Sequence, residues 1–185
     1  MEDKFILQAE ESVLLIVDIQ QGTLLDQMPE KELMVKNSCK LIKIAEELEI
    51  PIVVTEQYPK GIGPTAKEIK ACLPMDTPMI EKMTFDACTD ELLEVLNKLG
   101  RSKIIMVGLE THICVFQTTR GLLQRNYQVQ LVTDALQSRS QEHRLNAMET
   151  LQQMGAVATN HETVIFDLLK VAGTAAFKKI LPLLK

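Results

Sequence analysis

Residues 103–125, KIIMVGLETHICVFQTTRGLLQR, carry the strongest fold signal in this chain. An apolar run from Lys103 to Val107 stops at a glycine. It gives way to apolar residues at helical spacing from Val115 onward. This pattern is typical of a buried parallel strand, a tight turn and a helix. We predict such a unit here, with Thr111 as the helix N-cap and Cys114 in the first helical turn.

Cys114 is the cysteine with a sequence-level reason to be reactive. At a helix start, unpaired N–H groups and the helix dipole favour thiolate over thiol. The alternative is that Cys114 is a small buried hydrophobic residue. Cys39, Cys72 and Cys88 are scattered and show no CxxC spacing, so a zinc site or a redox pair has no support. In a reducing compartment we expect free thiols.

Apolar runs and helical periods alternate along the whole chain. The runs predict further strands at 12–18, 50–55, 78–82, 127–134 and 156–159, and the periods predict helices at 30–49, 66–71, 90–99, 141–154, 162–169 and 174–181. Such alternation gives a doubly wound α/β fold with a parallel sheet and helices on both faces. We predict one domain over residues 1–185, with a Gly- and Pro-rich loop at 56–65. The last helix packs on its own domain or on a second subunit.

Composition excludes several classes of function. The net charge is −5 with no basic cluster larger than Lys178-Lys179, which argues against a nucleic-acid partner. The sequence contains neither a dinucleotide-binding nor a P-loop glycine motif, and we expect no cofactor. No apolar run approaches the roughly 20 residues that span a bilayer, and the N-terminus lacks signal-peptide features. We therefore expect a cytoplasmic protein without a membrane partner.

Asp18, Lys82 and Cys114 each fall at or just after the carboxyl end of a predicted strand. In open parallel sheets, ligands bind beyond these ends, so we expect the three side chains to share one crevice. A carboxylate can take and return a thiol proton, and an ammonium group reduces the cost of holding two anions together. The set suits a thiol hydrolase of an amide or related carbonyl compound. Singly, Asp18 could cap a turn and Lys82 could be a solvated charge.

The same residues carry a resemblance to a known family. LIVDIQ at 15–20, Lys82 and GLETHICV at 108–115 resemble the opening strand, the lysine and the nucleophile turn of the isochorismatase-like cysteine hydrolase superfamily. TEQYP at 55–59 and SRSQ at 138–141 resemble its isochorismatase domain-containing branch. The likeness covers nearly the whole chain.

The resemblance implies a three-layer, Rossmann-like fold with a six-stranded sheet in the order 3-2-1-4-5-6. It implies an Asp18, Lys82 and Cys114 triad acting through a thioester, and a homo-oligomer, either dimer or tetramer. It also implies a cis peptide between Leu109 and Glu110. That peptide would turn the Glu110 and Cys114 amides into an oxyanion hole.

Departures from the family limit what the resemblance transfers. Nicotinamidases of this superfamily carry an Asp/His metal site after the second strand, and residues 56–65 contain no histidine. We therefore expect no catalytic metal and no nicotinamide substrate. Because isochorismatase itself differs at the nucleophile position, Cys114 disfavours vinyl-ether cleavage.

Other assignments remain open in the sequence. Candidate substrate-binding residues are Gln20, Thr55, Tyr58 and Phe85, each of which could instead serve packing. Asp134 is expected to be a structural turn residue that bonds nearby amides before Ser138. A noncatalytic binding or scaffold protein is the main alternative function. A peroxide sensor at Cys114 ranks last.

Overall fold

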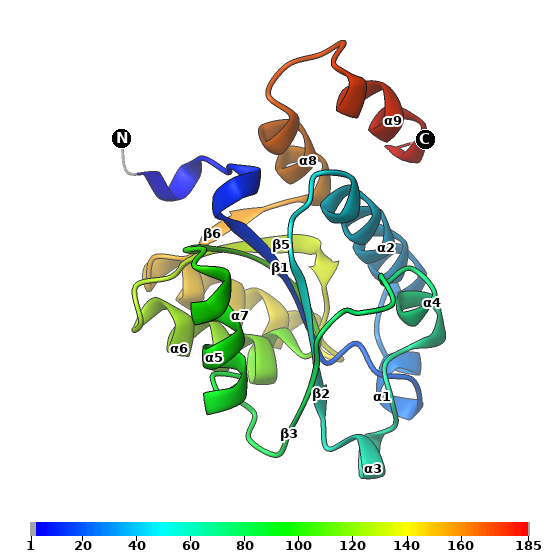
Figure 1. Ribbon diagram of the computed structural model, residues 1–185. Coiled ribbons are helices and arrows are strands. Elements are labelled where there is room, and N and C mark those ends of the chain that lie inside the picture. The colour runs from blue at the N-terminus through cyan, green and yellow to red at the C-terminus, as the bar shows by residue number, and fades with distance from the viewer. Residues whose placement is uncertain (1–2, 185) are drawn as a thin grey trace.

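Six short strands rich in apolar residues form one parallel sheet in the computed structural model, which describes residues 3–184 (Figure 1). The strand order is β3-β2-β1-β4-β5-β6, as predicted. The strands are β1 (Ser12–Val17), β2 (Ile52–Gln57), β3 (Met79–Lys82), β4 (Lys103–Gly108), β5 (Gln128–Leu136) and β6 (Val157–Thr159). The order reverses between β1 and β4. In such sheets, ligands bind at that reversal.

Helices cover both faces of the sheet (Figure 1). The longer ones are α2 (Lys31–Glu47), α5 (Asp90–Leu99), α6 (Phe116–Leu123), α7 (Gln141–Gln153), α8 (His161–Leu169) and α9 (Ala175–Leu184). Short helices α1 (Thr23–Asp26), α3 (Pro59–Ile62) and α4 (Lys67–Lys70) follow β1 and β2, and 3-10 turns lie at Asp3–Phe5 and Ala9–Glu11. The predicted helix at 90–99 is confirmed, and Gly100 ends it in the left-handed conformation at φ 63°.

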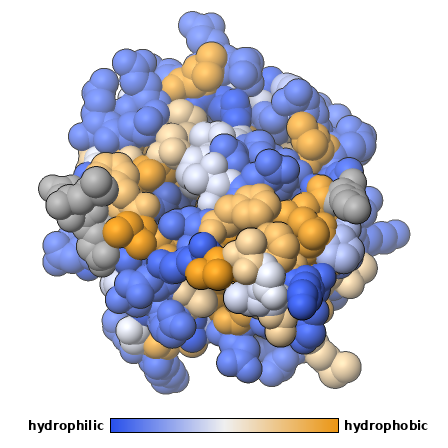
Figure 2. All heavy atoms as spheres, turned by 90° about the horizontal axis from the view of Figure 1, so that it is seen from above, coloured by the Kyte–Doolittle hydropathy of each residue, from blue (hydrophilic) through white to orange (hydrophobic). Residues whose placement is uncertain are grey.

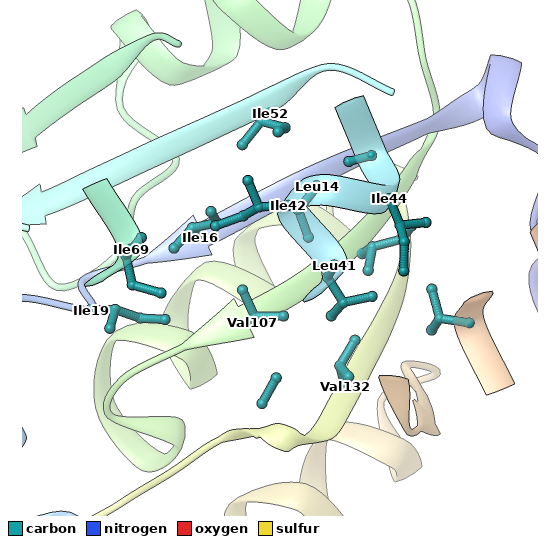
Figure 3. Close-up of a cluster of buried hydrophobic side chains, with 14 of the residues drawn as sticks. Leu14, Ile16, Ile19, Leu41, Ile42, Ile44, Ile52, Ile69, Val107 and Val132 are labelled. Atoms are coloured by element: carbon teal, nitrogen blue, oxygen red, sulfur yellow. The ribbon is translucent and has the colours of Figure 1, made fainter. Parts of the chain in front are cut away.

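Successive residues of the central strands enter different cores. On β1, Leu14 and Ile16 join a core with α2, α4, α8 and α9, which Figure 3 shows in part. Val13, Leu15 and Val17 face the opposite core, with α5, α6 and α7. All six β1 residues are buried. A strand buried on both faces needs a continuous apolar run, which is what the sequence has.

Two strand ends differ from the sequence prediction. β2 continues to Gln57 and β5 to Leu136. Polar residues near these positions predicted that the strands end earlier, but their side chains make hydrogen bonds within the protein. Part of the predicted loop is therefore strand, and Pro59 begins the short helix α3, a position where its missing N–H costs nothing.

The last helix packs on its own domain. Ile180 is fully buried in the core that α2 lines, and Lys179 pairs with Glu47 of α2 at 2.8 Å. Figure 2 looks down on the end of the molecule that carries α8, α9 and the N-terminal segment, where apolar and hydrophilic side chains are mixed. Across residues 3–184, no helix has the length and hydropathy that crossing a bilayer requires.

Candidate active site

Asp18 lies directly after β1, at the reversal of the strand order. Its backbone is left-handed at φ 53°, which costs a non-glycine residue about 1–2 kcal/mol. Two hydrogen bonds hold the strained residue: its amide donates to the Thr55 carbonyl at 3.1 Å, and its carbonyl accepts from the Gln20 amide at 2.9 Å. The side chain is buried, and its Oδ1 accepts from the Thr55 hydroxyl at 2.7 Å. Backbone strain maintained this way is typical of functional sites.

Lys82, the last residue of β3, reaches the same point. Its Nζ lies 2.6 Å from Asp18 Oδ2, and the side chain is fully buried. Nζ also donates to Gln57 Oε1 at 2.7 Å and approaches the Thr84 and Phe85 carbonyls at 3.3 and 3.4 Å. A buried ion pair persists when further hydrogen bonds replace lost water, and these acceptors provide them.

Cys114 follows β4 in an unusual helical turn. Residues Thr111–Val115 form a π-helix that leads into α6, and the residue at its N-cap is Glu110, not Thr111. The Thr111 hydroxyl donates instead to the Gln137 carbonyl at 3.0 Å, so the predicted N-cap is wrong. Cys114 is buried, with 7% of the residue exposed, and its thiol lies close enough to Asp18 and Lys82 for both to act on its pKa. The structure therefore brings together the three residues expected at the strand ends.

The acidity of Cys114 is the reverse of the sequence expectation. Burial, and then the Asp18 carboxylate, raise the pKa of Cys114 to about 12, although Lys82 acts to lower it. The helix dipole does not outweigh these effects. A second anion beside Asp18 in a buried site is costly, so the resting sulfur is a protonated thiol.

The Leu109–Glu110 peptide is trans, like every peptide bond in the described residues, so the expected cis peptide is wrong. A cis bond before a non-proline residue costs about 3 kcal/mol. Here the chain satisfies its backbone in trans: the Leu109 amide donates to the Val17 carbonyl at 2.8 Å, and the Glu110 carbonyl accepts from Ile113 and Val115.

The Glu110 side chain anchors the turn that carries Cys114. It is buried and pairs with Arg139 Nε at 2.5 Å, and its other oxygen accepts from the Arg139 amide at 3.2 Å. Beside it, His112 Nδ1 lies 3.1 Å from Ser138 Oγ. Burial lowers the pKa of His112. These contacts fix the turn that holds Cys114 against the loop after β5.

Gln20 and Thr55, two of the predicted substrate-binding residues, are occupied with internal bonds. Gln20 accepts from the Gln57 amide at 2.8 Å and donates to the Gln57 and Gly63 carbonyls at 3.0 and 2.5 Å. Thr55 is fully buried behind Asp18. Both therefore hold the site in shape, and neither presents a free polar group to a ligand.

Tyr58 and Phe85 are about half exposed, at 46% and 52%. The Tyr58 amide donates to the Lys82 carbonyl at 2.9 Å, and Phe85 contributes a carbonyl near Lys82 Nζ. Their backbones thus belong to the surroundings of Lys82, with aromatic side chains available to a ligand.

Asp134 makes long-range contacts instead of capping a local turn. It lies within β5, and its two oxygens accept from the His161 amide at 2.9 Å and contact His161 Nδ1 at 2.5 Å. This pair joins β5 to the start of α8. The expectation that Asp134 bonds amides just after it is wrong, because the strand continues past that point.

Three supporting side chains were not predicted from the sequence, which named Glu110 only for its backbone amide. Gln57 binds Lys82, Glu56 accepts from the Thr65 amide and hydroxyl at 2.6 Å, and Glu110 holds the turn that carries Cys114. Glu56 and Gln57 lie in the predicted loop, and Glu110 lies in the predicted turn. Their only sequence signal is a polar residue next to a strand end.

Residues 3–184 contain no cluster of three or more His, Cys, Asp or Glu side chains arranged to hold a metal ion. The absence of a catalytic metal stays a prediction.

Comparisons with known proteins show the family and the fold of the chain. The Isochorismatase domain family model matches residues 12–163. Isochorismatase family protein 1B of Dictyostelium discoideum is 36% identical over 180 residues, which cover 95% of this chain and 87% of that protein. Among solved structures, the MAR1 ribonuclease from Caenorhabditis elegans has a TM-score of 0.91 and 35% identity, covering 96% of this chain and 91% of its own. YcaC from Pseudomonas aeruginosa, solved with hexane-2,5-diol and covalent acrylamide, has a TM-score of 0.88 and 25% identity, covering 96% and 91%. The chain belongs to the isochorismatase domain family and has the isochorismatase-like hydrolase fold.

Proposed function

We propose that this protein is a metal-independent cysteine hydrolase that cleaves a small amide, carbamoyl or related carbonyl compound. The observation that carries the proposal is the proximity of the Cys114 thiol to a buried ion pair, in which Lys82 Nζ lies 2.6 Å from Asp18 Oδ2. In such a pair, the carboxylate can accept the thiol proton, and the ammonium group offsets the negative charge of the carboxylate.

Charge balance supports Asp18 as the general base. The net charge of a thiol, a carboxylate and an ammonium group is zero. Loss of the thiol proton to solvent would leave a net negative charge in a buried site. Burial and the Asp18 carboxylate raise the pKa of Cys114 to about 12. Moving the proton from Cys114 to Asp18 keeps the net charge at zero. The proton would therefore pass to Asp18 as the sulfur attacks.

The remaining steps follow from this transfer. Attack on the carbonyl carbon gives a tetrahedral oxyanion, which we assign to the Glu110 and Cys114 backbone amides by resemblance alone, because the Leu109–Glu110 peptide is trans. Asp18 returns the proton to the leaving amine as the thioester forms. Water then attacks the thioester with Asp18 again acting as base. Lys82 keeps the carboxylate in place throughout.

The relatives add two considerations. Acrylamide is an electrophile, and its covalent attachment in YcaC from P. aeruginosa is consistent with a nucleophile in that protein. The C. elegans relative is named a ribonuclease. The net charge of −5 and the enclosed thiol disfavour an RNA substrate for this chain, because RNA binding depends on phosphate contacts with basic residues. A direct assay with labelled RNA tests that alternative.

The decisive experiment combines turnover with covalent trapping. The protein is incubated with a panel of small amides, carbamoyl compounds and imides, and quenched samples are weighed by mass spectrometry. We expect an acyl adduct on the Cys114 peptide and loss of both adduct and turnover in Cys114→Ala. Cys88→Ala is the matched control, because Cys88 is partly buried and its thiol donates to the Thr118 carbonyl away from the site.

A noncatalytic binding protein is the alternative function. It would bind members of the panel without turnover and without an adduct, and Cys114→Ala would leave its affinity unchanged.

Two further expectations have their own tests. Hydrolysis that survives treatment with a chelator would support the metal-independent mechanism. By resemblance we propose a homo-oligomer, which sedimentation analysis of the full chain would test.

A further inference from the structure

Cys39 and Cys72 meet on the side of the sheet that α2 covers. Cys39 lies in the middle of α2, and Cys72 follows α4 by two residues. The two helices lie side by side (Figure 1). Both cysteines are free and only partly buried, and both pack against the same core. The lack of CxxC spacing in the sequence gave no sign that these two cysteines lie near each other.

At the end of α4, a backbone carbonyl accepts a hydrogen bond from the Cys39 thiol. A regular helix would continue with the Cys72 amide donating to the Glu68 carbonyl. Instead, the Cys72 amide donates to the Ile69 carbonyl at 2.9 Å, and the Cys39 thiol donates to the Glu68 carbonyl at 3.4 Å. Glu68 lies one helical turn before Cys72, so this hydrogen bond brings the Cys39 thiol to the end of α4 that carries Cys72, and Cys72 is close enough to raise the pKa of Cys39. The two thiols therefore lie near each other where α2 and α4 meet.

A surface pocket of about 690 Å³ gives access to both sulfurs. Cys39 and Cys72 line it, together with Gln21 and Gly22 from the loop after Asp18. A pocket of this size admits water and small oxidants. Bulky reagents or another protein are not needed to reach the pair.

We propose that Cys39 and Cys72 are a dithiol modification site that a small hydroperoxide converts into an internal disulfide. Hydrogen peroxide is the simplest oxidant of this class. The Cys72 thiolate attacks one peroxide oxygen, the O–O bond breaks, and hydroxide leaves, which gives a sulfenic acid on Cys72. Cys39 sulfur then attacks the Cys72 sulfur, and the thiol proton leaves with the hydroxyl group as water. In sum, two thiols and one peroxide give one disulfide and two waters.

The order of the two steps follows from the surroundings of Cys39. Burial, followed by the hydrogen bond with Cys72, raises the pKa of Cys39 to about 12. Because the thiolate is the reacting form, Cys39 is a poor first nucleophile and a suitable second partner. The same protonation slows only the second step, the attack of Cys39 on the Cys72 sulfenic acid.

The disulfide would tie α2 to the segment that supports Asp18. Just before α4, the Ala66 amide donates to the Ile19 carbonyl and the Gln21 amide donates to the Pro64 carbonyl, both at 2.9 Å. Fixing α4 to α2 would therefore restrain both loops beside the candidate active site. Closing the chain between residues 39 and 72 should raise the midpoint of thermal unfolding by about 10 °C. This inference does not depend on the proposed hydrolase function.

The test is peptide mapping of the full chain after hydrogen peroxide treatment. Trypsin would release the peptides 37–40 and 71–82, each with one of the two cysteines. We expect these peptides joined, with a mass lower by two hydrogens, and separated again by a reductant. The thermal midpoint should rise with the cross-link and fall back on reduction.

Single variants check the pairing and the order of the steps. In Cys39→Ser, we expect a sulfenic acid on Cys72 that a dimedone probe captures, and no cross-link. In Cys72→Ser, Cys39 should resist the same peroxide dose. Cys88→Ser should oxidise like the parent chain, and circular dichroism of the reduced variants verifies folding. The proposal is overturned if both peptides are oxidised singly in the parent chain, stay unmodified, or are joined only between different chains.

Discussion

Asp18 both raises the pKa of Cys114 and is the proposed acceptor of its proton. These two roles predict opposite effects of the substitution Asp18→Asn. Removing the carboxylate leaves Lys82 next to the sulfur, so the pKa of Cys114 should fall from about 12 toward its ordinary value of 9.0. Alkylation by iodoacetamide at pH 8–9 should become faster, because more thiolate is present. Hydrolysis should become about 10² to 10⁴ times slower, because the base is gone.

The measurement is the rate of each reaction in the parent and variant proteins over a range of pH. In the parent chain, the alkylation rate should keep rising through pH 9 without a plateau. If alkylation and hydrolysis both become slower in Asp18→Asn, the role of Asp18 is to maintain the structure of the site, and Asp18 is not the acceptor of the thiol proton. Lys31→Ala, which removes an exposed ion pair with Asp26, serves as the surface-charge control.

Gln57 is predicted to be a positioning residue for Lys82. Its Oε1 accepts from Lys82 Nζ at 2.7 Å, and its Nε2 donates to the Met83 carbonyl at 2.9 Å. A hydrogen bond to a buried charge contributes about 1.5–3 kcal/mol. Gln57→Leu should therefore lower kcat about 10- to 100-fold, with a smaller change in KM. Gln57→Glu keeps an acceptor for Lys82 and should lose less, and equal losses in the two variants would point to packing instead.

At the scale of elements, Gly108 lets β4 approach β1 at the point where the site begins. A Cβ on Gly108 would lie 2.2 Å from the Val17 carbonyl oxygen, and its φ is 144°. Val17 immediately precedes Asp18, so a shift here moves the candidate active site as well. We expect Gly108→Ala to lower the free energy of unfolding by about 3 kcal/mol or more.

Denaturant unfolding of Gly108→Ala and Gly155→Ala separates the clash from the backbone cost. Gly155 also has a positive φ, 109°, but a Cβ there would meet no atom within 4 Å. Gly155→Ala should cost only about 1–2 kcal/mol. Equal losses in the two variants would mean that β4 moves away from β1 without penalty.

The elements whose apolar pattern is long and regular were predicted well from sequence. The buried runs of β1 and β4 need apolar side chains on both faces, and the periodicity of α5 follows from its single buried face. Strand ends were harder, because Gln57 and Asp134 are polar residues that the protein uses internally. Hydrogen bonding across the fold, and not local preference, sets those boundaries.

In the candidate site, too, some features could be predicted from the sequence and others depend on contacts across the fold. Its three principal residues could be inferred because parallel strands end together at one edge of the sheet. The supporting residues Gln57 and Glu110 could not, since their partners are 25 and 29 positions away. The acidity of Cys114 was mispredicted for a related reason: the helix start is a local feature, whereas burial and the Asp18 charge come from the whole fold.

At the scale of the whole molecule, buried thiols link stability to pH. Burial is the main cause that raises the pKa of Cys39, Cys88 and Cys114 to about 12, compared with an ordinary value of 9.0. Between these values the unfolded chain loses thiol protons that the folded chain retains. The free energy of unfolding must therefore fall as pH rises from about 9 to 12, by at most about 1.4 kcal/mol per pH unit for each thiol.

Cys114→Ala isolates the contribution of the most buried thiol. Removing the sulfur changes the packing energy by an amount that does not depend on pH. Removing the titrating thiol changes the slope of the free energy of unfolding against pH. Urea unfolding at several pH values above 8, with a reductant present, should show a shallower decline for Cys114→Ala than for the parent chain. Ionisable groups distant from Cys114 contribute equally to both curves and cancel in the difference. Parallel curves would mean that Cys114 ionises at nearly the same pH in the folded and unfolded chains, which would remove the charge-balance argument for Asp18 as its base.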